Sequence, residues 1–308
     1  MRDDSPFHSG ELIVQERSGM RERIERAGRR MIRDFMPEEH RLFFEELPFL
    51  VVGSVDDRGR PWASIVHGSP GFVTSPHPRS LMVAALPTAG DPLHENLRAG
   101  AALGLLGIQL ETRRRNRANG HVSWKSESGF ELAVEQSFGN CKQYIQSRTR
   151  QGPAGAPSAQ PGGSALGRRA LELLSRCDTA FVASASANPA LGGREGVDVS
   201  HRGGLPGFLH VEGSRVTLPD YRGNFLFNTL GNIEVNPRAG LLACDLERGD
   251  LLLLTASASI SWEGSELVRF PGAERLLHLD TAEHVLLSRG LGEVWSAPEF
   301  AREFVSIE

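Results

Sequence analysis

Two short segments in the second half of the chain combine residue types that hold a phosphate. Residues 200–204 read Ser-His-Arg-Gly-Gly, and residues 220–224 read Asp-Tyr-Arg-Gly-Asn. Arginine can bind a phosphate through two parallel hydrogen bonds, and glycine lets the backbone approach the anion. A helix is expected soon after, with Asn228, Thr229 and Asn232 at helical spacing, and its N-terminus would add free N–H donors. The two segments therefore predict either a phosphate site or ordinary turns with surface arginines.

The chain repeats itself at an offset of about 132 to 136 residues. Residues 63–72 (ASIVHGSPGF) match residues 198–208 (DVSHRGGLPGF), so the first copy keeps a histidine, His67. Four shorter matches follow in the same order: residues 86–87 with 218–219, 90–91 with 223–224, 95–97 with 228–230, and 104–106 with 240–242. An ordered series of this kind is typical of a duplicated unit. The first copy has no counterparts of Arg202 and Arg222, so only the second copy is predicted to carry the phosphate site.

The elements around these motifs are mainly strands. Helical spacing predicts helices near residues 20–35 and 37–47, and the period then changes to that of a β-hairpin over residues 49–66. The second copy begins in the same way, with a helix at 168–177 and a strand at 179–186. The chain is therefore expected to be mainly β with flanking helices (α+β).

The duplication also predicts the domain organisation. Residues 1–150 would hold the N-terminal helices and a first barrel with a degenerate site. The Pro-, Gly- and Ser-rich residues 151–167 would be a linker, and residues 168–308 would form a second barrel with the main site and a C-terminal segment. No strand is followed by Gly-x-Gly-x-x-Gly, which argues against a Rossmann domain.

Composition excludes several classes of protein. A net charge of −4 argues against nucleic-acid binding. No apolar run of 18 residues and no signal peptide is found, so a cytoplasmic protein without a membrane partner is expected. The three cysteines, Cys141, Cys177 and Cys244, are too far apart for a zinc ribbon, and we expect no metal site and buried thiols. The two lysines, Lys125 and Lys142, fit neither a P-loop nor a pyridoxal-phosphate site.

The second copy resembles a known family. Residues 197–208 (VDVSHRGGLPGF), 218–225 (LPDYRGNF), 228–232 (NTLGN) and 236–241 (NPRAGL) are similar to the flavin-nucleotide-binding branch of the pyridoxamine 5′-phosphate oxidase-like split β-barrel superfamily. Residues 7–11, 112–120 and 136–145 resemble that branch too, so the likeness spans most of the chain. One departure is Lys142, where the Asn-Cys-Pro pattern of the branch has proline.

The resemblance implies a fold and a cofactor. It implies two tandem split β-barrels related by an internal pseudo-two-fold axis, with FMN or FAD in a groove between barrels. Because such barrels usually come from two subunits, this tandem chain would be a monomeric pseudo-dimer or a homodimer. One flavin per chain is expected, since only the second copy carries the arginines.

The resemblance also assigns residues. Ser200, Arg202, Arg222, Asn224 and Thr229 would hold the flavin phosphate. Others would complete the cofactor site: His201 and Pro206 beside the ring or ribityl chain, Gln136, Ser137, Asn140 and Tyr144 from the facing barrel, and Tyr221, Gly223, Asn228 and Asn232 around the phosphate segments. The residues themselves leave alternatives open: a structural role for His201 and a helix cap at Ser137 or Asn140. The cluster of Arg113, Arg114, Arg115 and Arg117 would either meet a pyrophosphate or an acidic cofactor, or form a solvated strand face, which is the favoured interpretation.

Three functions follow from the resemblance. The first is a flavin-dependent oxidoreductase acting on an unknown small molecule, with electrons from NAD(P)H or a donor protein; the sequence identifies no catalytic residue. The second is a haem-binding or haem-handling protein with His201, His67 or His8 as axial ligand. The third is a non-catalytic flavin-binding module. In a flavoenzyme the ring performs the redox chemistry, and the protein anchors it and excludes water.

Overall fold

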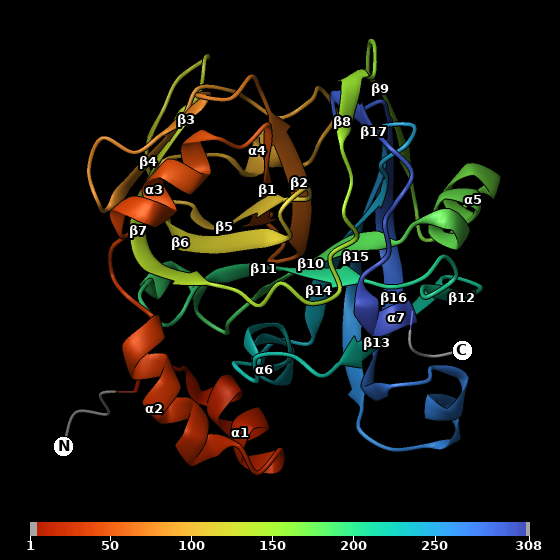
Figure 1. Ribbon diagram of the computed structural model, residues 1–308. Helices are drawn as coiled ribbons and strands as arrows, with labels where there is room; N and C mark the ends of the chain where they lie inside the picture. The colour runs from red at the N-terminus through yellow and green to blue at the C-terminus, as the bar shows by residue number, and fades with distance from the viewer. Residues whose placement is uncertain (1–4, 306–308) are drawn as a thin grey trace.

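A computed structural model describes residues 5–305 and consists mainly of two large antiparallel sheets (Figure 1). In spatial order the first sheet contains β2 (Pro61–His67), β1 (Phe49–Val55), β5 (Ala102–Gln109), β6 (Arg114–Lys125), β7 (Phe130–Gly139), β4 (Ser80–Val83) and β3 (Val73–Thr74). The second contains β11 (Val197–Gly203), β10 (Thr179–Ala185), β14 (Arg238–Asp245), β15 (Asp250–Ser261), β16 (Ala273–Ser288), β13 (Arg215–Tyr221) and β12 (His210–Glu212). The prediction of a mainly β chain with flanking helices is confirmed.

The two sheets have the same topology. Replacing β1 to β7 by β10 to β16 in chain order converts the first strand order into the second. The helices follow the same scheme: α3 (Glu38–Glu45) precedes β1 as α5 (Arg168–Arg176) precedes β10, and α4 (Leu93–Asn96) precedes β5 as α6 (Asn228–Val235) precedes β14. We call residues 38–139 the first unit and residues 168–288 the second unit.

Strand register corrects the alignment of the two copies. Phe49 pairs with His67 in the first unit, and Thr179 pairs with Gly203 in the second. The counterpart of His67 is therefore Gly203, and the counterpart of His201 is Ile65. Identical letters had suggested a match between His67 and His201, but a shift by one or two residues changes which side chains correspond.

Two equivalent buried hydrogen bonds show how the segments before β5 and β14 correspond in the two units. Asn96 donates to the Ser54 hydroxyl at 3.0 Å in the first unit, and Asn232 donates to Ser184 at 3.0 Å in the second. Ser54 and Ser184 occupy equivalent positions in the hairpin registers. Asn96 therefore corresponds to Asn232, and the shorter sequence matches at offsets near 133 are wrong by about three residues.

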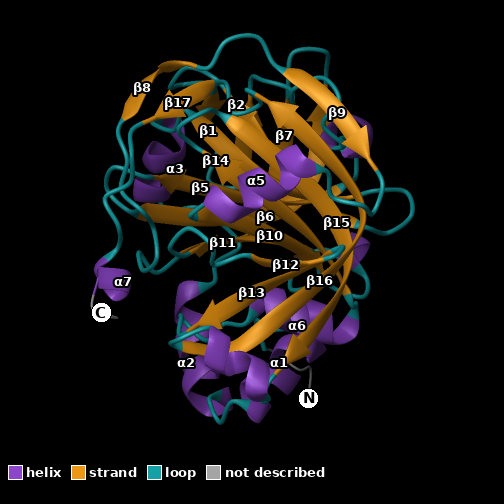
Figure 2. Ribbon diagram, turned by 90° about the vertical axis from the view of Figure 1, so that its right-hand side faces the viewer, coloured by secondary structure: helices purple, strands orange, loops and turns teal. Residues whose placement is uncertain are grey.

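The units pack against each other through equivalent glycines. A Cβ atom added at Gly104 of β5 would lie 2.4 Å from the Val197 carbonyl oxygen, at the start of β11. A Cβ at Gly240 of β14 would lie 2.6 Å from the Pro61 carbonyl oxygen, at the start of β2. Gly104 corresponds to Gly240, and Pro61 to Val197. The interface therefore has approximate two-fold equivalence, which Figure 2 shows as sheets meeting at the middle of the molecule.

The remaining elements cover the ends of the sheets. Helix α1 (Ser9–Arg17), which the sequence analysis left without a prediction, packs closely on α6, because a Cβ at Gly10 would lie 2.0 Å from the Gly231 carbonyl oxygen. Helix α2 (Arg21–Met31) lies beside α1 (Figure 1). Elements not yet placed are β8 (Arg150–Pro153), β9 (Ser158–Gly162), β17 (Glu293–Trp295), α7 (Arg302–Val305) and the 3₁₀ turns Pro189–Leu191 and Ser265–Arg269. Strand β9 pairs with β16, so the expected linker of residues 151–167 contains regular structure.

Candidate functional site

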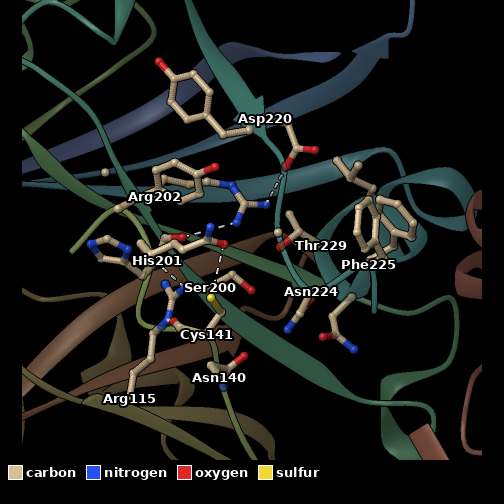
Figure 3. A pocket seen from close by; sticks show the side chains of 18 of the residues that line it. Arg115, Asn140, Cys141, Ser200, His201, Arg202, Asp220, Asn224, Phe225 and Thr229 are labelled. Atoms are coloured by element: carbon tan, nitrogen blue, oxygen red, sulfur yellow. Dashed lines mark hydrogen bonds and ion pairs between the residues drawn. The ribbon is translucent and has the colours of Figure 1, made fainter. Parts of the chain in front are cut away.

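A polar pocket lies where the two units meet (Figure 3). Strand β6 and residues 140–144 form one side of it, and β11, the end of β13 and the start of α6 form the other. Its volume is about 840 Å³ when the solvent at its open mouth is included. The site therefore needs both halves of the chain.

Arg117 of β6 ties the two units together at the base of the pocket. Its guanidinium donates to the Asp198 carboxylate at 2.7 Å and to the Asn228 side chain at 2.9 Å. It also donates to the Ser200 hydroxyl at 2.6 Å. Arg117 is only 2 % exposed, so the sequence alternative of a solvated strand face is wrong for this residue. The buried ion pair with Asp198 holds β11 and α6 in position.

Three further arginines give the pocket a positive character. Arg275 pairs with Asp220 at 2.9 Å, and Arg202 lies 3.4 Å from the same carboxylate. None of the ion pairs found within residues 5–305 includes Arg115, which instead donates to the Cys141 carbonyl at 2.5 Å. The pKa of Arg115 is lowered to about 10, chiefly by burial; Cys141 opposes this shift, and nearby Arg202 and Arg117 contribute to it. Arg275 has a second carboxylate partner in Glu274 at 2.7 Å, whereas Arg202 only shares Asp220 and Arg115 is in none of the ion pairs of residues 5–305. Arg115 and Arg202 therefore favour an anion in the pocket.

Several buried polar atoms face this pocket without a partner among the described residues. They are both ring nitrogens of His201, the Thr229 hydroxyl, the Asn140 amide nitrogen and Nε of Arg117. His201 is 4 % exposed and Thr229 3 % exposed. Burial, followed by Arg115 and Arg202, holds the pKa of His201 well below its usual value, so the imidazole is neutral. A buried polar group without a partner is costly, which favours a polar ligand at this place.

The backbone at the start of α6 is strained toward the pocket. Phe225 and Phe227 have φ of +60° and +65°, a conformation that non-glycine residues rarely adopt. Phe227 is the N-cap residue, and no side chain caps the helix. The first N–H groups of α6, beside the Thr229 hydroxyl, are therefore available to an anionic acceptor. Strain of this kind clusters at functional sites.

An aromatic wall closes another side. The rings of Tyr144 and Tyr221 stack with centroids 5.3 Å apart, and Phe304 contacts both of them. Tyr144 also has a positive φ of +66°, and its hydroxyl donates to the Arg222 carbonyl at 2.8 Å. Burial raises the pKa of Tyr144 to about 12, so this hydroxyl keeps its proton at neutral pH. The wall gives an otherwise charged pocket a flat apolar surface.

Most of the predicted cofactor residues come together here. The pocket is lined by Asn140, Tyr144, Ser200, His201, Arg202, Tyr221, Gly223, Asn224, Asn228 and Thr229. The arginine of the second phosphate segment, Arg222, does not line it and lies over the Phe225 ring at 5.6 Å. Asn232 is buried behind the site, bonded to Ser184, and Pro206 lines a separate surface groove.

Gln136 and Ser137 lie elsewhere. Both belong to strand β7, so neither begins a helix as the alternative interpretation required. Gln136 lines a different cavity, and the Ser137 hydroxyl is buried 3.4 Å from Nδ1 of His40. Their part in binding a cofactor stays a prediction.

Several lining residues were not predicted as site residues: Leu106, Arg115, Arg117, Cys141, Gln143, Gly203, Asp220, Phe225, Phe227, Leu230 and Arg275. Arg115 and Arg117 were singled out as part of a charged cluster but left without a place. Their spacing was the available signal, because alternate residues of a strand point to the same face. Cys141 was expected to be buried, yet it is partly exposed at the pocket.

The pseudo-equivalent region, where β2 of the first unit meets β15 of the second, is filled with apolar side chains. Strand register matches His201 with Ile65, Arg115 with Leu251 and Arg117 with Leu253. These three residues are buried in one hydrophobic cluster together with Trp295. We call Ile65, Leu251, Leu253 and Trp295 the filled region. Beside it, the hydroxyl of Ser64, the counterpart of Ser200, donates to Asp91 at 2.6 Å rather than facing an open site.

Membrane-spanning helices and metal clusters are not found in the described part of the chain. No helix within residues 5–305 is long and apolar enough to cross a bilayer. No group of three or more histidine, cysteine, aspartate or glutamate side chains there has the geometry of a metal site.

Comparison with known proteins finds similarity only at the level of structure. No family model matches the sequence, and no curated protein matches it. General Stress Protein 26 from Bacillus anthracis is similar over 43 % of this chain and 94 % of its own, at 14 % identity and a TM-score of 0.26. A pyridoxinephosphate oxidase family protein from Clostridium acetobutylicum covers 44 % and 93 %, at 14 % identity and a TM-score of 0.27. HutZ, the haem storage protein of Vibrio cholerae, covers 45 % and 99 %, at 18 % identity and a TM-score of 0.27. These scores are too low to assign a function.

Proposed function

We propose that this chain binds one flavin nucleotide, FMN or FAD, and acts as a flavin-dependent oxidoreductase on a small molecule. In this proposal the two units are split β-barrels, and the cofactor lies in the pocket between them. The observation that carries the proposal is the set of arginines and unpartnered donors gathered around the start of α6. A phosphate would satisfy them together.

The residues present fit such a cofactor. Arg202, Thr229 and the uncapped first turn of α6 would hold the phosphate, since Arg275 already neutralises Asp220 at 2.9 Å. The Tyr144–Tyr221 wall offers an apolar face for a flat ring. When bound, the flavin would supply the redox chemistry, while the protein orients it and excludes water. The substrate and the electron donor, whether NAD(P)H or a protein, stay open.

Haem is the second candidate, and one observation favours it. His201 lines the pocket as a neutral imidazole with both nitrogens unpartnered, which is the form that ligates iron. The other two candidate ligands are placed less well. Nδ1 of His8 accepts a hydrogen bond from the Gly10 N–H and caps α1, and His67 is absent from the residues that line the pocket.

Titration of the purified full chain with FMN, FAD and haemin tests both candidates. We expect flavin fluorescence to change with saturation near one equivalent per chain, because the filled region leaves no second pocket. A Soret band on addition of haemin, with no change in flavin fluorescence on addition of FMN or FAD, would show that the pocket binds haem and not flavin. Saturation at two flavins would show that the first unit also binds.

Arginine variants test the phosphate site directly. A charge-assisted contact contributes about 1.5 to 3 kcal/mol, so Arg202→Ala should raise the flavin Kd by roughly ten-fold to over a hundred-fold. Arg222→Ala should change it little, because Arg222 does not line the pocket. Arg114→Ala is the matched control, because Arg114 precedes Arg115 on β6 but lies over the Phe43 ring. Equal Kd values in all three variants would place the phosphate elsewhere.

A further inference from the structure

Cys141 differs from the other cysteines of the chain. Cys177 and Cys244 are each 2 % exposed, and burial raises the pKa of both thiols. Cys141 follows β7, is partly exposed and lines the pocket between the units. Its Sγ lies 3.2 Å from the Gln143 amide oxygen, so the thiol is held in place and yet reachable.

The surroundings of Cys141 are those of an anion site. Figure 3 shows the thiol among Arg115, Asn140 and Ser200. Arg115 is bonded to the Cys141 carbonyl and has no carboxylate partner among the ion pairs of residues 5–305. The buried side chain of His201, 96 % covered and with both nitrogens unpartnered, lines the same pocket. A ligand that carries both negative charge and hydrogen-bonding groups therefore fits next to the sulfur.

We propose that Cys141 is a thiol–disulfide exchange site selective for small disulfides that bear carboxylates. In the exchange the thiol gives its proton to water, and the sulfur attacks one sulfur of the disulfide. A new S–S bond to Cys141 forms, the original S–S bond breaks, and the other half leaves as a thiolate. Cys141 is oxidised and the leaving half is reduced, so no further oxidant is needed.

Charge explains the selectivity. The guanidinium groups of Arg115, Arg117 and Arg202 would attract the carboxylates and stabilise negative charge on the leaving sulfur. A neutral disulfide gains neither effect. The proposal goes beyond flavin binding and requires only the pocket, so each can fail without the other.

Ellman's reagent, a disulfide with two carboxylates, is the probe for the native full chain. We expect release of one equivalent of thionitrobenzoate per chain, none from Cys141→Ser, and three from wild type in denaturant, since the chain has three cysteines. No release from the native chain, or release that persists in Cys141→Ser, would overturn the proposal.

A second comparison tests the role of charge. Arg115→Gln should slow the reaction with Ellman's reagent about ten-fold and leave the reaction with neutral 4,4′-dithiodipyridine unchanged. Arg114→Gln is the control and should change neither rate. Equal slowing of both reagents by Arg115→Gln, or an unchanged rate with Ellman's reagent, would show that the charge of Arg115 does not discriminate between the two disulfides. Either outcome refutes the anion site. Protection of Cys141 by FMN is a separate test of where the flavin binds.

Discussion

The pocket and the filled region occupy equivalent places in two copies of one scaffold, yet they have opposite characters. His201, Arg115 and Arg117 surround an open polar pocket, whereas their counterparts Ile65, Leu251 and Leu253 pack into the core. The strand order is the same on both sides. The difference teaches that the backbone topology does not determine whether this place becomes a site. A few inward-pointing side chains determine it.

The comparison also separates two ways of stabilising one interface. Apolar residues in the filled region gain free energy by leaving water. In the pocket, Arg117 and Asp198 are buried as an ion pair, which gives little net stability but is costly to break. The pocket side should therefore be the more sensitive to substitution of a single residue.

The largest effect is expected when Arg117 is replaced by the residue at its counterpart. Arg117→Leu removes the cation paired with the buried Asp198 carboxylate, which keeps the amide donors of Asn119 and Asn232. It also removes the guanidinium donor to Asn228 and Ser200, so the free energy of unfolding should fall by about 3–5 kcal/mol. Urea denaturation measures this. Arg114 is an exposed neighbour on the same strand, and Arg114→Leu should change the free energy of unfolding by no more than about 0.5 kcal/mol. A similar small change for Arg117→Leu would mean that the buried pair does not hold the units together.

A pH-dependent effect is expected in the first unit. Burial raises the pKa of Asp91 to about 7, although the Ser64 hydroxyl and the Leu93 N–H oppose the shift. The folded protein therefore binds a proton that the unfolded chain has lost, and stability falls as pH rises from about 4 to about 7, by about 1.4 kcal/mol per pH unit for this group. Asp91→Asn removes this loss.

Urea denaturation of Asp91→Asn and wild type across this pH range checks the sign. The free energy of unfolding of the variant should increase relative to that of wild type as pH rises, by up to about 4 kcal/mol in total, because the amide cannot ionise. A difference that stays constant with pH would show that Asp91 ionises as easily in the folded chain as in the unfolded one.

The smallest predicted effect tests the equivalence of the two halves. Gly104→Ala and Gly240→Ala should destabilise the protein by similar amounts, about 1–3 kcal/mol each, because both added methyl groups meet a backbone carbonyl of the other unit. Thermal unfolding provides the comparison. Gly163→Ala, with open space around its Cβ, is the control. Unequal losses at the two glycines would show that the interface has diverged as far as the pocket has.

Local patterns in the sequence were enough for the duplication, the mainly β class and most helices. The alignment of the copies was less accurate, because identical letters paired His67 with His201 while strand pairing matches His201 with Ile65. The amino-acid sequence does not directly specify which strands are neighbours in a sheet. The same limit hid Arg117, because its partners on β11 and α6 are 81 and 111 residues away.

The site residues also divide into those that local motifs identify and those that only the folded structure identifies. Ser200, Arg202, Asn224 and Thr229 belong to short segments of the second unit, and local motifs were enough to find them. Cys141, Asp220 and Arg275 take their meaning from neighbours that only folding provides. Helix α1 was missed because its buried face holds Gly10, Glu11 and Gln15 beside Val14 and therefore forms no apolar stripe. Its close contact with α6 depends on Gly10 and Gly231.

The covalent connection between the two units has a consequence for how the pocket responds to dilution. A pocket built by two separate subunits is lost when the subunits dissociate, so its occupancy depends on protein concentration. Here residues 140–144 and β11 belong to one polypeptide, and their encounter is intramolecular, at an effective concentration fixed by the chain. Ligand affinity at this pocket should therefore be the same at nanomolar and micromolar protein.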